Sequence, residues 1–386
     1  MKKRSCIVVS SPYSWGGGIK TMVDEGLKML KSLDYKNTLF IPSYSKEKDI
    51  SEIKAKKIST IRFISFDKYP LLHHIIFGLK LKNLCQKYNI ALAIVATCHT
   101  ALPLALSKKP FCIWVATNYA DELEAKFNSG FGDKLAERLR NSTQWWFLEK
   151  IEKYVLRKST SILALSDYTA SKLLKLEPHI KAKLSVLNLP INTKLFSPKK
   201  SIKKIKGLLI NTGRINDPRK NTQLLIKTFS IIIKNYPKAK LLLIGEEANI
   251  ELINLIKFLK LENSIKVIPK KPRDHLANYL RKAEIFVTTS MQEGLGISIL
   301  EAMSCGLPVV TTHCGGPETI IKESGGGIIA NNNEKDFSKT VIHLLLNKPL
   351  RIKMGIKGRD YISNSLSFIS QKEKLSLKLN KQYAKQ

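Results

Sequence analysis

Short apolar runs alternate with amphipathic stretches along nearly the whole chain. Buried parallel strands read as continuous apolar runs, and the helices that cover their sheet read as amphipathic stretches. The pattern therefore predicts an α/β protein built on parallel sheets. The expected strands are 6–11, 37–42, 59–64, 91–97, 111–117, 161–166, 207–213, 239–245, 265–269, 284–290 and 307–313.

The alternation lapses once, at 199–206, where "KKSIKKIK" after Pro198 is typical of an exposed linker. We therefore predict two Rossmann-like, doubly wound domains, 1–198 and 199–368, with a last helix at about 369–386 that packs back on the first. Open sheets of this kind bind ligands at the carboxyl ends of their strands. The expected site is a cleft between the two domains.

The composition adds a strong positive charge to this picture. The 386 residues contain 65 Lys+Arg and 31 Asp+Glu, a formal net charge of +34. Such a balance favours anionic partners, namely phosphorylated ligands, acidic membranes or nucleic acid. The alternative is that the dispersed lysines only solvate the surface. Six cysteines without CxxC or zinc spacing indicate a reducing compartment and no metal site.

The longest uncharged run is Ile90–Ser107. Pro103 and the central "TCHT" favour a strand, a turn and a short helix over a membrane span. The apolar stretch near the N-terminus is too short for a signal peptide. We expect a cytoplasmic protein.

Two loops that follow expected strands carry groups suited to anions. In "PYSWGGGIK", Gly17 and Gly18 open a helix and let a phosphate approach its positive end, although a mere flexible turn is the alternative. In "TGRINDPRKN", Arg214 and Lys220 can both reach one anion. The alternative is that Arg214 and Lys220 are merely two of the many surface cations.

The strongest signal is "MQEGLGISILEAMSCGLP" (291–308). Glu293 follows a strand, and Gly294 and Gly296 keep the next loop thin. A helix begins near Ile297 and exposes its first N–H groups, with Glu301 one turn inside. Carboxylates accept hydrogen bonds from sugar and ribose hydroxyls, and nearby cations should keep both glutamates ionised.

These motifs resemble those of the family-4 retaining glycosyltransferases of GT-B fold. The likeness covers most of the chain and is most specific from Gly207 to about Ile329, through Arg214, Lys220 and the segment from "EGLG" to "CGLPVV". The passage "LNLPINTKLFSP" (187–198) is similar to the stretch that connects the two domains in that family.

The resemblance implies a role for each motif. Arg214 and Lys220 would bind the donor diphosphate, and Glu301 would bind the ribose hydroxyls of the nucleotide. Glu293 would hold the transferred sugar. The donor-binding residues that complete this set are the backbone N–H groups of Gly294, Leu295, Gly296 and Ile297, and Gly17 and Gly18 against the diphosphate.

The acceptor side departs from the family. Many relatives carry a histidine after the strand that matches 111–117, where this chain has Asn118 followed by Asp121 and Glu122. Any of these three could face the acceptor. His99, after the preceding strand, is an alternative site histidine or a structural one.

No Asp-x-Asp pair occurs, so Arg, Lys and helix N–H groups would supply the positive charge without a metal or another cofactor. We therefore expect a metal-independent transfer of sugar from a nucleotide-diphosphate donor to a hydroxyl of a cell-envelope glycan or lipid-linked saccharide. The Trp145–Leu148 cluster and the basic charge suggest contact with anionic lipid at the inner face of the plasma membrane. A buried amphipathic helix is the alternative for this cluster. The alternatives are a GT-B nucleotide-sugar epimerase and a basic nucleic-acid-binding protein, although no nucleic-acid-binding module is recognisable.

Overall fold

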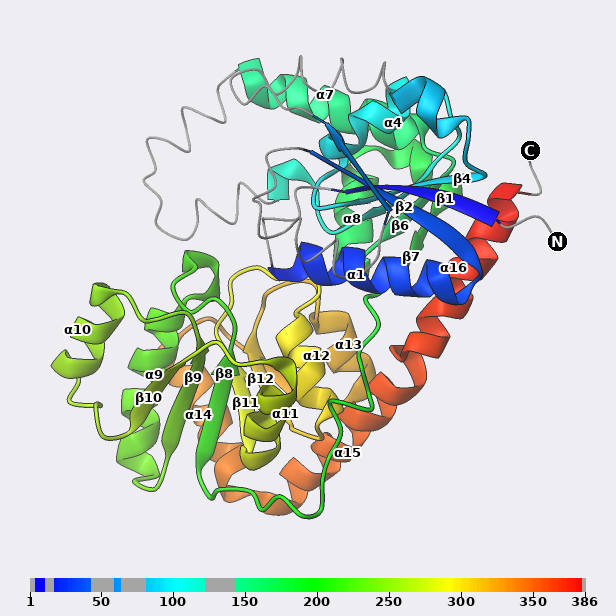
Figure 1. Ribbon diagram of the computed structural model, residues 1–386. Coiled ribbons are helices and arrows are strands. Elements are labelled where there is room, and N and C mark those ends of the chain that lie inside the picture. The colour runs from blue at the N-terminus through cyan, green and yellow to red at the C-terminus, as the bar shows by residue number, and fades with distance from the viewer. Residues whose placement is uncertain (1–3, 11–16, 43–58, 64–80, 122–142, 384–386) are drawn as a thin grey trace. The chain divides into compact units, whose positions relative to one another are not determined.

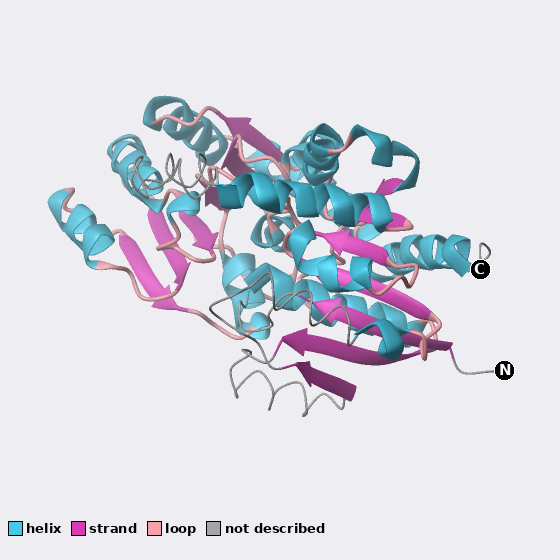
Figure 2. Cartoon of the chain, turned by 90° about the horizontal axis from the view of Figure 1, so that it is seen from above, coloured by secondary structure: helices cyan, strands magenta, loops and turns pink. Residues whose placement is uncertain are grey.

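The computed structural model describes residues 4–10, 17–42, 59–63, 81–121 and 143–383. These form two compact units. Described residues 4–121, 143–189 and 368–383 make the first, and 190–367 make the second. Each unit contains one parallel sheet with helices packed along it (Figures 1 and 2).

The sheet of the first unit has seven described strands in the order β3-β2-β1-β4-β5-β6-β7. Their bounds are β1 Arg4–Ser10, β2 Tyr35–Pro42, β3 Ser59–Phe63, β4 Ile90–Val95, β5 Cys112–Val115, β6 Ser161–Ala164 and β7 Leu184–Val186. All neighbours are parallel, and β1 pairs with β2 on one side and β4 on the other. The strand order therefore reverses at β1, where α1 (Gly17–Ser32) follows.

Two short helices of the first unit, η2 (Cys98–Ala101) and α4 (Leu102–Leu106), follow β4. The uncharged run from Ile90 to Ser107 forms β4, the 3-10 helix η2 and α4, as its proline and polar centre predict. Further helices of this unit are α7 Thr143–Lys158, α8 Asp167–Leu176, η3 Pro178–Lys183 and α16 Phe368–Tyr383. No described helix has the length and apolarity to cross a membrane.

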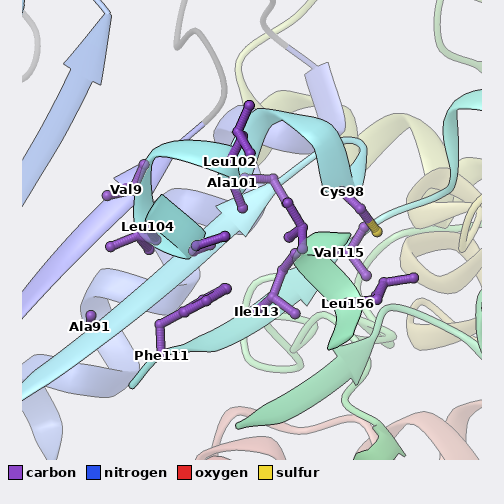
Figure 3. Close-up of a cluster of buried hydrophobic side chains, with 14 of the residues drawn as sticks. Val9, Ala91, Cys98, Ala101, Leu102, Leu104, Phe111, Ile113, Val115 and Leu156 are labelled. Carbon is purple, nitrogen blue, oxygen red and sulfur yellow. The ribbon is translucent and has the colours of Figure 1, made fainter. Parts of the chain in front are cut away.

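One hydrophobic core cluster of the first unit lies between its sheet and the helices η2, α4 and α7. Figure 3 shows its side chains turned toward one another, with Cys98, Val115 and Leu156 together at one end. All three are completely buried. Strand β5 is apolar on both faces because Ile113 and Trp114 are also fully buried.

The sheet of the second unit has six described strands in the order β10-β9-β8-β11-β12-β13. Their bounds are β8 Leu208–Thr212, β9 Lys240–Gly245, β10 Ile265–Pro269, β11 Ile285–Thr288, β12 Val309–Thr312 and β13 Gly327–Ala330. Strand β8 lies between β9 and β11, so the order reverses there. Ligands of open α/β sheets bind beside such a reversal.

The helices of the second unit follow its strands in sequence (Figure 1). They are η4 Pro218–Lys220, α9 Thr222–Asn235, α10 Ile250–Phe258, α11 Arg273–Lys282, α12 Ile297–Ser304, α13 Glu318–Ser324, α14 Glu334–Leu346 and α15 Lys348–Ser365. The core of this unit draws on residues from Leu209 to Leu345.

The second unit begins at Pro190 rather than after residue 198, because the segment before the linker packs into it. Phe196 is completely buried, and its carbonyl oxygen accepts hydrogen bonds from Ser304 and Arg359. Ile191 is also buried and donates its N–H to Leu366. The lysine-rich stretch at 199–206 therefore lies within the second compact unit, whereas the sequence predicts the domain boundary after residue 198.

Candidate functional site

The loop after β8 holds two cations near one carboxylate. Arg214 follows Gly213, and its Nη2 lies 2.9 Å from Oδ2 of Asp217. Arg219 contacts the same oxygen at 2.8 Å. Burial opposes the charge of Asp217, but the hydrogen bonds and charges of Arg219 and Arg214 outweigh burial and lower the pKa of this carboxyl. Asp217 thus fixes the loop as an anion, and the Arg214 side chain stays 60% exposed.

Lys220 and Glu293 meet although 73 residues separate them. The Nζ atom of Lys220 lies 2.5 Å from Oε1 of Glu293, and Ser290 donates its hydroxyl to the same oxygen at 2.9 Å. Lys220 ends η4 at the carboxyl end of β8, and Glu293 lies in the loop after β11, the neighbouring strand. The reversal of strand order therefore brings together Lys220, which is predicted to bind the diphosphate, and Glu293, which is predicted to bind the sugar.

The backbone at Glu293 is fixed by a second loop, which follows β12. Glu293 donates its N–H to the carbonyl of Cys314 at 2.7 Å and accepts from Gly316 N–H at 2.8 Å. A Cβ atom on Gly316 would lie 2.1 Å from the carbonyl oxygen of Gly294, a distance no side chain allows. Glu318, which the sequence did not single out, accepts the N–H of Cys314 and so orders this loop from the other side.

Helix α12 begins where the sequence predicts, at Ile297. Gly296 precedes it with φ 72°, in the left-handed region that favours glycine. The first N–H groups of a helix have no partner within it and attract anions. Leu295 is buried beneath this turn, so Gly294, Gly296 and Ile297 offer mainly backbone.

Glu301 lies one turn into α12 and is only 6% exposed. Its Oε1 is 2.5 Å from Nη2 of Arg273, the first residue of α11. Burial raises the pKa of Glu301 to about 7, and the charge of Arg273 only partly offsets this. Burial thus opposes the charge that the sequence predicts for Glu301, because removal from water outweighs the nearby cation.

Some of the site residues that the sequence predicts on the first unit lie among the described residues, and others do not. Gly17 is the first residue of α1 and Gly18 is exposed on its first turn, just beyond the strand-order reversal at β1. Their contact with a diphosphate stays a prediction. Glu122 lies outside the described residues, as does the loop at 11–16.

The carboxyl ends of β4 and β5 are connected by Glu152, a residue of α7 that sequence analysis missed. Glu152 is 1% exposed and accepts the N–H of Cys98 at 2.9 Å and of Tyr119 at 3.1 Å. His99 lies between these loops, with Nδ1 3.9 Å from Oε1 of Glu152 and its ring edge-on to Tyr119.

Asn118 and Asp121 are both buried, so neither presents an exposed side chain. The Asn118 side-chain oxygen accepts the N–H of Asp121 at 2.8 Å. Asp121 accepts the Tyr168 hydroxyl at 2.6 Å and lies 2.7 Å from Nζ of Lys172. The acceptor role of Asn118, Asp121 and His99 remains a prediction.

Comparison with known proteins agrees with this arrangement. Residues 192–361 match the family model described as Glycosyl transferases group 1. An uncharacterized glycosyltransferase of Methanocaldococcus jannaschii is 26% identical over 221 residues, which are 54% of this chain and 56% of that protein. The match thus spans little more than half the length of that relative.

Solved structures resemble the chain over nearly its full length. HepE of Anabaena, in complex with UDP, gives a TM-score of 0.78 at 14% identity and covers 97% of this chain and 99% of that one. WaaG, a glycosyltransferase involved in lipopolysaccharide biosynthesis, gives 0.69 at 15% identity with 96% and 98% covered. The fold is GT-B. Residues 192–361 are thus similar in sequence to the glycosyl transferases group 1, and the chain has the fold of the GT-B glycosyltransferases.

Proposed function

We propose that the protein transfers a sugar, with retention of configuration, from a nucleotide-diphosphate donor to a hydroxyl of a cell-envelope glycan or lipid-linked saccharide. The meeting of Lys220 and Glu293 beside the N-terminus of α12 carries this proposal. A cation, a carboxylate and a row of helix N–H groups in one place match the phosphate and the hydroxyls of a sugar nucleotide.

Each group has a defined task in this reaction. Lys220 leaves Glu293 to bind the diphosphate and, with Arg214, offsets the charge that develops as the diphosphate departs. Glu293 then accepts hydroxyls of the sugar, and Glu301 those of the ribose. Two cations and a helix N-terminus supply this charge without a metal ion.

Turnover of a sugar nucleotide tests the assignment. A thermal-shift screen of UDP-, GDP-, ADP- and dTDP-sugars identifies the donor, because a ligand that binds only the folded form raises its melting temperature. Lys220→Ala should then lower donor turnover by about a hundredfold or more. The control is Lys227→Ala, which removes an exposed cation from α9.

Two outcomes would redirect the proposal. Equal turnover in the Lys220→Ala and control proteins would remove Lys220 from the site. Conversion of the donor sugar in the absence of any acceptor would indicate an epimerase instead.

Two observations support the proposal of a cell-envelope acceptor. They are the similarity to WaaG and an exposed aromatic surface on α7. Helix α7 exposes 62% of Trp146 and 41% of Phe147, and Lys150 Nζ lies 5.2 Å from the centre of the Trp146 ring. Aromatic residues interleaved with lysines suit the interface of an anionic membrane. The chain should therefore sediment with acidic vesicles at low salt and much less after Trp146→Ala. Equal sedimentation with neutral vesicles would contradict an electrostatic contact.

A further inference from the structure

Arg273 occupies a position that neither the glycine loops nor the paired glutamates of the sequence indicate. It opens α11, and its guanidinium reaches the buried Glu301 from a strand-to-helix connection 28 residues earlier in the chain. The same guanidinium stacks over the Phe196 ring, 5.2 Å from its centre. Phe196 is completely buried, so one side of the Arg273 head group has a rigid support.

Other ionisable groups lie at and around Cys305, at the C-terminal end of α12, and the three cations among them donate to backbone carbonyls. These groups are Arg281, Arg359, Lys204 and Cys305. Arg281 and Arg359 donate to backbone carbonyls between Thr193 and Ser197, and Lys204 donates to that of Ala283. Burial raises the pKa of Cys305 to about 12, so its thiol is neutral. Among these described groups, Arg273 is the cation that forms an ion pair with Glu301.

We propose that Arg273 is a positioning residue of the nucleotide site, which holds Glu301 ionised and oriented to accept the ribose hydroxyls of the donor. This inference rests on the proposed function. An ionised carboxylate offers acceptors on both oxygens, whereas a protonated one carries an O–H that donates and leaves fewer acceptors. The hydroxyls of a ribose therefore favour the charged form.

Burial raises the pKa of Glu301 and so disfavours the ionised carboxylate, whereas the charge of Arg273 lowers this pKa. With a pKa of about 7, Glu301 is protonated in much of the free protein at pH 6. Donor binding then has to release a proton, so affinity falls as the pH drops below 7, by at most about tenfold per pH unit. Removal of the Arg273 charge raises the pKa further and moves this fall to higher pH.

Calorimetric titration with UDP-glucose and, in parallel, GDP-mannose measures the effect from pH 6 to 8.5. Their diphosphates are esterified at both ends and do not titrate in this range. In Arg273→Met the midpoint of the affinity curve should move above that of the unaltered protein, with binding about tenfold weaker at pH 7.5. Arg273→Lys keeps the charge and should restore most of the affinity.

Lys282→Met is the matched control, because it removes one cation from the opposite end of α11. Its affinity curve should coincide with that of the unaltered protein. An unchanged midpoint in Arg273→Met, with normal binding by the unaltered chain, would overturn the role of Arg273 and leave the proposed function intact. Failure of the unaltered chain to bind these two donors and every other sugar nucleotide of the thermal-shift screen would count against the proposed function, and this inference would fall with it.

Discussion

Three carboxylates of this chain show how immediate neighbours decide what the same side chain can do. Glu152 is held by two backbone N–H groups from the ends of β4 and β5 and therefore organises loops. Glu293 shares one oxygen between Lys220 and Ser290. Glu301 pairs with one cation, Arg273, and burial dominates its pKa. Glu301 is therefore expected to change charge near neutral pH.

That change of charge predicts a pH-dependent stability. In the nucleotide-free protein the folded state keeps a proton on Glu301 up to about pH 7, whereas the unfolded chain loses it near 4.5. The folded state therefore binds more protons between these values, and its free energy of unfolding falls as pH rises through this window. Glu301→Gln should abolish this fall, which is on the order of 3 kcal/mol. Urea denaturation at pH 5 and pH 8 measures it, and the same pH dependence in both proteins would contradict the prediction.

At the scale of elements, the site depends on the close approach of the loops after β11 and β12. Gly316→Ala forces a Cβ atom against the Gly294 carbonyl and should move Glu293, whose backbone pairs with Gly316. We expect donor affinity to fall by about tenfold or more, because a displacement of about 1 Å at a site is enough for such losses.

A second glycine provides the control for this substitution. Gly325 ends α13 with φ 60°, and a Cβ atom there would meet only the flexible side chain of Lys357 at 3.4 Å. Gly325→Ala should cost about 1 kcal/mol of stability and leave donor affinity unchanged. Equal losses of affinity in both proteins would show that Gly316 acts through stability alone.

The sequence predicts long buried elements well and contacts between distant segments poorly. Strands such as β4 are continuous apolar runs and were recognised, whereas β7 and β13 are short and half-buried and left no such pattern. Arg214 and Lys220 can be proposed from the sequence because they follow a predicted strand, and their roles stay predictions. The contact between Arg273 and Glu301 could not be predicted from the sequence. It depends on how α11 and α12 pack, and Arg273 is one of many similar cations in the chain.

At the scale of the whole molecule, each unit has a hydrophobic core of its own. The core of the second unit draws on residues from Leu209 to Leu345, all within 190–367. The Lys220–Glu293 and Arg273–Glu301 pairs also lie within this range. A fragment of residues 190–367 should therefore fold alone and unfold in one cooperative transition.

The start of that fragment decides its stability. A fragment that begins at residue 199 lacks Ile191 and Phe196, both of which are buried in the second unit. It also lacks the Phe196 carbonyl, which accepts hydrogen bonds from Arg359 and Ser304. Loss of one large buried side chain costs about 3–5 kcal/mol, much of the stability of an ordinary domain. We expect the shorter fragment to be largely unfolded where the longer one shows a sharp denaturation curve. Equal stability of the two would show that 190–198 is only a connector, as the lysine-rich linker had suggested, and Arg273 would then have no firm support in Phe196.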